Sequence, residues 1–120
     1  MSSTVRAAHY KRLNGKYLKD GEALLARKDY VQASEKLWGA AAEVVKTVAA
    51  RRGVTLRAHR SISQFVAKLD DEHPELGLAA EFGVANNLHT NFYEDWLAPR
   101  MVEKHADVVR SFIRKMERFL

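Results

Sequence analysis

Apolar side chains recur every three or four residues along almost the whole chain, which is the spacing of one face of an α-helix. No stretch alternates apolar and polar residues in the manner of a strand. Amphipathic helices with short connections between them predict an all-α fold, an antiparallel bundle of four to five helices. The predicted helices cover about residues 4–27, 29–52, 61–71, 75–96 and 99–120.

Several residues mark the expected helix ends. Asp29 is expected to cap the start of the second helix, and Gly53 to end that helix in a left-handed conformation. Pro74 and Pro99 are expected in the first turns of the fourth and fifth helices, where proline is tolerated. No low-complexity stretch suggests a linker, so the sequence predicts a single domain spanning residues 1–120.

Small residues predict which helix lies at the centre of the bundle. The second helix follows Trp38 with a run of glycine and alanine at 39–42, which allows neighbouring helix axes to approach closely. Gly21 lies on the apolar stripe of the first helix, although glycine weakens a helix by up to about 1 kcal/mol relative to alanine. We therefore expect the second helix to be central, with another helix close to Gly21.

The composition is that of a globular protein, with 47% hydrophobic and 29% charged residues. The absence of cysteine excludes disulfides, thiolate metal sites and cysteine nucleophiles. No apolar run reaches the roughly 18–20 residues that span a bilayer, and the first residues do not resemble a signal peptide. We therefore expect a cytoplasmic protein with no membrane partner.

The net charge of +5 is unevenly distributed, with basic clusters within residues 6–19, 51–60 and 110–118. Arg57 and Arg60 belong to the second cluster and could line a site. One interpretation is a surface for nucleic acid or another polyanion. The other is solvated helix faces, with the arginines near residue 52 placed to complement a helix dipole.

The predicted fourth helix contains a polar segment around His89. Three asparagines fall within six residues there, a poor choice for helicity alone. Asn86 and Tyr93 each lie one turn from His89, and an amide or a phenol could fix the tautomer of the imidazole. The segment is either a polar pocket, with His89 as base or ligand contact supported by Asn86, Asn91 and Tyr93, or a half-buried histidine satisfied by its neighbours.

Metal chemistry has little support in the sequence. No two histidines are three or four residues apart, and no His-Glu-x-x-His pair occurs. The acidic run at 70–72 is typical of a solvated helix end. No phosphate-binding glycine loop or nucleophile elbow is present, so we predict no metal and no cofactor.

Two segments carry a resemblance to a known family. Residues 32–43 (QASEKLWGAAAE) and 88–94 (LHTNFYE) resemble the archaeal PaREP family of small helical proteins, within the HEPN superfamily. The resemblance extends over about residues 17–120. It implies a four- or five-helix bundle that pairs as a homodimer and associates with RNA or a nucleotide. It also implies a nucleotidyltransferase-type protein partner, as in toxin–antitoxin systems.

Ribonucleases of that superfamily carry an arginine separated from a histidine by four to six residues. Ahead of His89, positions 82–84 hold Phe, Gly and Val, so the cation that would stabilise a phosphate in the transition state is missing. Arg100 and His105 have the required spacing but follow the proline that begins the last predicted helix. The resemblance therefore favours a non-catalytic protein over a ribonuclease using His89, or Arg100 with His105.

Three functions follow from the sequence. The first is a HEPN-like bundle that dimerises and binds a nucleotide, an RNA or a protein partner without catalysis. The second is a metal-independent ribonuclease with a degenerate motif around His89. The third is a protein-interaction module, since Gly21 and residues 30–41 resemble one helical hairpin of the tetratricopeptide type, although no second copy follows.

Overall fold

The computed structural model describes residues 2–120 and contains only helices and their connections there. The all-α bundle predicted from the sequence is confirmed. The elements in chain order are α1 (Ser3–Ala26), α2 (Tyr30–Arg51), α3 (His59–Glu72), the 3₁₀ turn η1 (Pro74–Leu76), α4 (Leu78–Glu94) and α5 (Pro99–Glu117).

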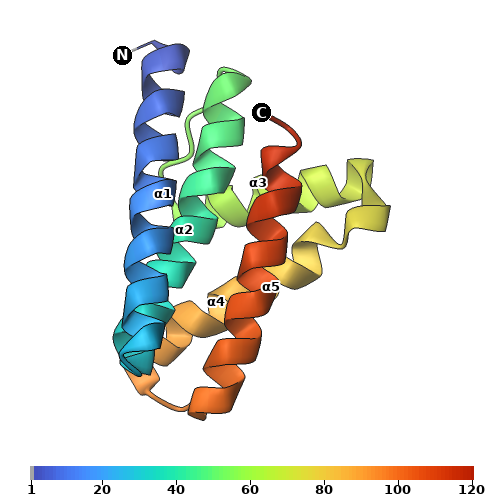
Figure 1. Cartoon of the computed structure of the whole chain (residues 1–120). Helices are drawn as coiled ribbons and strands as arrows, with labels where there is room; N and C mark the ends of the chain where they lie inside the picture. The colour runs from blue at the N-terminus through green and yellow to red at the C-terminus, as the bar shows by residue number, and fades with distance from the viewer. Residues whose placement is uncertain (1) are drawn as a thin grey trace.

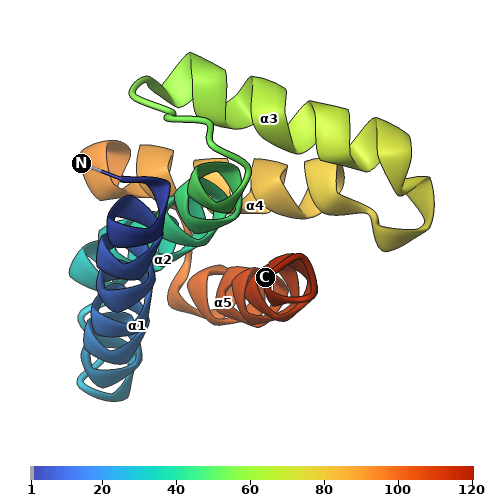
Figure 2. The ribbon, with the colours of Figure 1, turned by 90° about the horizontal axis from the view of Figure 1, so that it is seen from above.

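The helices form two antiparallel hairpins and a closing helix. α1 and α2 make the first hairpin, and α3 and α4 make the second, which crosses the first (Figure 1). α5 runs in the same direction as α2 and packs against both α2 and α4 (Figure 1). α3 lies along α4 on the side away from α5 (Figure 2). This arrangement brings α2, α3 and α4 together.

α2 is the central helix, as its small residues predicted. It contacts each of the other four helices, and most of its side chains are buried. The core that it organises also takes Val66 from α3, Leu88 from α4 and Phe112 from α5. Burial of apolar surface of this kind supplies most of the driving force for folding.

α1 and α2 approach closely at two glycines. A Cβ atom on Gly21 would lie 3.1 Å from the side chain of Leu37, and one on Gly39 would lie 3.0 Å from the ring of Tyr17. One turn of α1 before Tyr17, the buried Asn14 donates from Nδ2 to the backbone oxygen of Ala40 at 2.8 Å. The expected close approach at Gly21 is therefore confirmed, with α2 as the neighbour.

Three of the expected helix ends are also confirmed. The carboxylate of Asp29 accepts a hydrogen bond from the backbone N–H of Gln32 at 3.3 Å, as an N-cap does. Gly53 adopts a left-handed conformation, with φ of 76°, directly after α2. α5 begins at Pro99, as predicted.

The start of the fourth helix was predicted wrongly. Pro74 begins only the short turn η1, and Gly77 then adopts a left-handed conformation, with φ of 66°, before α4 begins at Leu78. A left-handed residue cannot continue a right-handed helix, so the glycine separates the two elements.

The end of α4 differs as well. The apolar pattern extended the helix to Trp96, but α4 ends at Glu94, and Asp95 is left-handed with φ of 47°. Trp96 is 54% exposed instead of lying in the core. α3 begins at His59, two residues before the predicted start. Within residues 2–120, no helix combines the length and apolar character needed to cross a bilayer.

Candidate functional site

An aromatic cluster lies where α2, α3 and α4 meet. Trp38 of α2 is only 9% exposed, and two imidazole rings lie against its indole. The ring centroid of His89, on α4, is 4.9 Å from that of Trp38, with 27° between the planes. The corresponding values for His59, at the start of α3, are 4.8 Å and 34°. The two imidazole centroids are 5.6 Å apart, so three helices each contribute one ring.

The carboxylate of Glu35 fixes the orientation of His89. The distance from His89 Nδ1 to Glu35 Oε1 is 2.8 Å. Because an ionised carboxylate only accepts hydrogen bonds, Nδ1 carries a proton, and in a neutral imidazole Nε2 then keeps a lone pair. No group of the described residues 2–120 hydrogen-bonds Nε2. The half-buried ring therefore presents a nitrogen that is free to contact a ligand.

A second polar contact holds His59. Its Nε2 lies 2.7 Å from Oδ1 of Asn86, an acceptor, so Nε2 donates and Nδ1 keeps the lone pair. The sequence suggested that Asn86 would fix the tautomer of His89. The structure assigns that role to Glu35 and uses Asn86 for the other histidine.

An aromatic ring lies at the outer edge of the cluster, and two cations lie near His59 in the chain. Tyr93 is 71% exposed, and its ring meets that of His89 edge-on at 5.4 Å between centroids. Arg57 and Arg60 flank His59 in the chain and are both exposed. Neither arginine forms an ion pair or hydrogen bond with any of the residues described.

Asn91 belongs to the interior. It is fully buried, donates from Nδ2 to the hydroxyl of Ser34 at 3.0 Å, and accepts at Oδ1 from the backbone N–H groups of Trp96 and Leu97 at 2.8 and 2.7 Å. These bonds join α4 to α2 and hold the turn before α5. The amide is occupied within the fold, so we leave Asn91 out of the candidate site.

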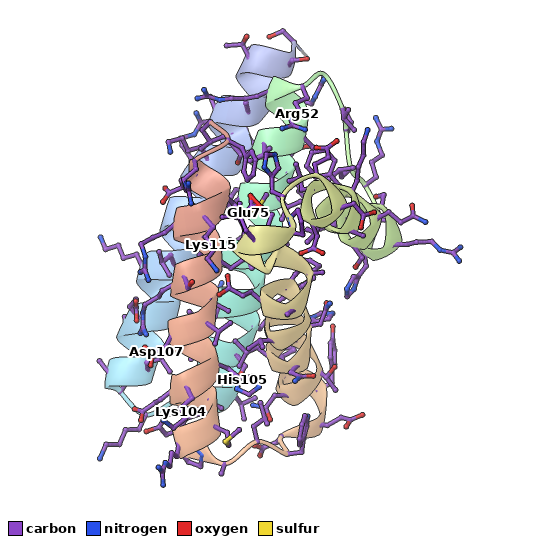
Figure 3. All side chains as sticks on the ribbon, turned by 90° about the vertical axis from the view of Figure 1, so that its right-hand side faces the viewer. Arg52, Glu75, Lys104, His105, Asp107 and Lys115 are labelled. Atoms are coloured by element: carbon purple, nitrogen blue, oxygen red, sulfur yellow. The ribbon has the colours of Figure 1, made fainter. Side chains whose placement is uncertain are left out.

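Arg100 and His105 lie on α5, apart from this cluster. Arg100 is exposed in the first turn, and His105 is half-buried farther along the helix (Figure 3). Five positions along an α-helix rotate a side chain by roughly 140° beyond one full turn, so the two residues lie on different faces. Neither hydrogen-bonds another residue of the described chain.

Several other basic residues are neutralised within the fold. Arg110 donates from Nε and Nη2 to the two carboxylate oxygens of Glu22 at 2.7 and 2.6 Å, which links α5 to α1. This hydrogen-bonded pairing lowers the pKa of Glu22 and raises that of Arg110. Lys115, on the side of α5 seen in Figure 3, contacts Glu81 at 3.2 Å and donates to the backbone oxygen of Leu76. These cations link helices of the bundle to one another.

A pocket of about 260 Å³ opens beside the cluster, between α1 and α2. Glu35 and Trp38 belong to both the pocket and the cluster. The ammonium group of Lys36 lies 5.1 Å from the ring centroid of Tyr17 at the pocket wall. Gly39 completes the lining, and the ring of Tyr17 packs against it.

The model of the archaeal PaREP1/PaREP8 family matches residues 9–113 of the chain. The chain belongs to this family. No curated protein and no solved structure matches it. The two segments that carry the PaREP resemblance, 32–43 and 88–94, are in direct contact: Ser34 meets Asn91, and Glu35 meets His89.

Sequence reasoning gave no functional role to three members of this cluster, Glu35, Trp38 and His59. The PaREP resemblance contained a signal for two of them, since Glu35 and Trp38 lie in the segment 32–43. Nothing in the local sequence pairs His59 with a partner 27 positions away. Among residues 2–120, no three histidine, aspartate or glutamate side chains are placed to hold a metal ion together.

Proposed function

We propose that this PaREP-family protein is a HEPN-like bundle that binds single-stranded RNA or a nucleotide, without catalysis, at the cluster around His89. The observation that carries the proposal is the stack of His59 and His89 on Trp38, with the exposed ring of Tyr93 at its edge. Unstacked bases bind to aromatic and imidazole faces, and such contacts contribute about 1–3 kcal/mol per base.

The charges beside the stack support a phosphate-bearing ligand. Arg57 and Arg60 keep their full hydrogen-bonding capacity, unlike Arg110 or Lys115, which are engaged by carboxylates. A guanidinium group can bind a phosphate through two parallel hydrogen bonds. The free Nε2 of His89 adds an acceptor that can take a hydrogen bond from a ribose hydroxyl.

The test is binding of a fluorescent single-stranded RNA over a range of salt concentrations. We expect the double variant Arg57→Ala, Arg60→Ala to bind more weakly and with a shallower salt dependence, by about 0.7 in slope for each phosphate that the variant no longer neutralises. The matched control removes two exposed cations of α5, Lys104→Ala with Arg114→Ala, and should leave both quantities close to wild type. Equal losses in the two double variants would contradict a localised site.

The proposal includes a homodimer and a nucleotidyltransferase-type protein partner of a toxin–antitoxin system. The supporting observation is that three large apolar side chains near the α4–α5 turn are exposed, Tyr93, Trp96 and Met101. Light scattering coupled to size-exclusion chromatography measures the mass directly. A monomeric mass at all concentrations would contradict the homodimer. Trp96→Ser would then leave the measured mass unchanged.

A second candidate function is metal-independent RNA cleavage, favoured by one observation. Glu35 orients His89 so that a basic Nε2 is free, as required for a general base. Incubating transfer RNA with the protein and a chelator tests this candidate, with His89→Ala and Glu35→Gln as variants. Cleavage that is absent, or equal in all three proteins, would exclude it.

A further inference from the structure

The pocket beside Glu35 is lined by groups that can bind a nucleobase. Two aromatic rings line it, those of Tyr17 on α1 and Trp38 on α2, and the ring of Tyr17 packs against Gly39 of α2. Its volume of about 260 Å³ admits one planar heterocycle. Glu35 and Lys36 place a carboxylate and an ammonium group at the same pocket.

The carboxylate of Glu35 retains the capacity to accept more hydrogen bonds. Its Oε1 accepts from His89 Nδ1, while Oε2 has no hydrogen-bond partner among residues 2–120. The side chain is 31% exposed, so a ligand can reach it. The pocket therefore offers two acceptor oxygens on Glu35 beside the ammonium donor of Lys36. Oε1 already accepts one hydrogen bond, and Oε2 accepts none from the described residues.

We infer that this pocket selects guanine. Guanine presents two adjacent donors, N1–H and the 2-amino group, next to the acceptor O6, which matches a carboxylate beside an ammonium group. Adenine presents an acceptor at N1, which a carboxylate repels, and cytosine does the same at N3. Uracil has one donor between two carbonyl groups and would set one of them against Glu35.

The inference rests on the proposed RNA or nucleotide binding and adds base specificity to it. Because Glu35 contacts His89, a guanine in the pocket would have its ribose and phosphate close to the stack of His59 and His89. The exposed Arg57 and Arg60 would then bind phosphates of any sequence. Specificity and general affinity thus come from different residues, which makes them separable by experiment.

The experiment compares short oligouridine RNAs that carry one guanosine, inosine or adenosine at the same position, with fluorescence anisotropy as the readout. We expect the guanosine RNA to bind about tenfold more tightly than the adenosine RNA. Inosine lacks the 2-amino group and should fall between them. Glu35→Gln should remove most of the difference, because an amide offers one acceptor where the carboxylate offers two. Lys36→Met should reduce the difference.

A matched control separates base recognition from a general effect of charge. Glu94→Gln removes an exposed carboxylate of α4 and should retain the guanosine preference. Loss of the preference in Glu94→Gln would show that Glu35 has no specific role, which would overturn the inference.

The inference and the proposed function fail in different ways. If all three RNAs bind equally and the Arg57→Ala, Arg60→Ala variant binds them all more weakly, the guanine pocket is wrong and RNA binding stands. If the wild-type protein binds none of the RNAs at low salt, the proposed function itself fails. A guanosine preference that Glu35→Gln leaves intact would place the recognition elsewhere.

Discussion

Two side-chain hydrogen bonds join α4 to α2, through nearby residues of each helix. They differ in how much hydrogen-bonding capacity the folded protein leaves unused. Asn91 binds Ser34, and the pair is fully buried with its principal hydrogen-bonding groups satisfied inside the fold. His89 binds Glu35, and this pair is half-buried with Nε2 and one carboxylate oxygen unused. The first link is structural, whereas the second has capacity left for a ligand.

The comparison shows that residue type alone does not identify a site. Asparagine and histidine are both capable of binding ligands, and both lie in the segment that resembles the PaREP family. What separates them is the position of the helix-turn junction, which buries Asn91 beneath the backbone of Trp96 and Leu97. A buried polar group that is fully satisfied supports the fold and leaves nothing for a partner.

The strongest test of the comparison is Asn91→Ala. The change removes three hydrogen bonds and leaves the backbone N–H groups of Trp96 and Leu97 without a partner, while the Ser34 hydroxyl still donates to the backbone oxygen of Tyr30. We expect a loss of about 3 kcal/mol in the free energy of unfolding, measured by urea denaturation. A loss below about 1 kcal/mol would mean that water replaces the amide and that the link is less structural than its burial indicates.

His89→Ala should affect RNA binding more than stability. The ring and its one hydrogen bond are only half-buried, so we expect the free energy of unfolding to change by no more than about 1 kcal/mol. RNA affinity should fall by about fivefold or more, because a stacking face is removed. Anisotropy and urea denaturation of the same preparation measure both quantities. A large stability loss with unchanged affinity would show that His89 has a structural role and no role in RNA binding.

A third link, between Glu22 of α1 and Arg110 of α5, is charged and should depend on pH. Hydrogen bonding to Arg110 lowers the pKa of Glu22 below its ordinary value of 4.5. The stabilisation is therefore present above that value and is lost as the pH falls through the lowered pKa. Glu22→Gln should cost about 0.5 kcal/mol at neutral pH, since both side chains are partly exposed, and less at about pH 3.

The uncharged hydrogen bond between Asn91 and Ser34 provides the control for that pH dependence. The cost of Asn91→Ala should be the same at both pH values, because neither Asn91 nor Ser34 titrates. Chemical denaturation of the wild type and the two variants at each pH gives the comparison. A cost of Glu22→Gln that grows on acidification would contradict the lowered pKa.

The smallest expected effect comes from Asn87, the remaining asparagine of the polar segment. Its side chain is exposed on α4 and forms no hydrogen bond within the described chain. Alanine is the better helix former, so Asn87→Ala should stabilise the protein by a few tenths of a kcal/mol, about 0.5 at most, and leave RNA binding unchanged. Thermal unfolding detects the gain. A loss of affinity would extend the site to this side of α4.

The sequence predicted the helices well because each amphipathic stripe is a local property. Asp29 and Gly53 marked their helix ends correctly for the same reason, since caps act within a few residues. Gly77 was misread because a glycine can either continue a helix or adopt a left-handed conformation, and the pattern of apolar residues does not distinguish the two. The junction after Pro74 was therefore missed.

The site was only partly predictable because its partners are distant in the chain. Helical spacing drew attention to His89, Asn86 and Tyr93, but it could relate them only to residues one turn away. Glu35 is 54 positions from His89, and its role depends on how α2 and α4 cross. Such a crossing is set by side-chain packing between helices and leaves no periodic trace in either segment.

The position of α3 has a consequence for when the cluster is complete. Only Ile62, Val66 and Leu69 of this helix are buried, and it rests on α4 and the edge of α2 (Figure 2). Segments with few buried contacts open locally at a lower free energy than the whole domain. Amide hydrogen exchange should therefore be faster along α3 than along α2. His59 would leave Trp38 during each such opening, while His89 would stay in contact with it. The protein would then alternate, without unfolding, between a cluster of three rings and one of two rings.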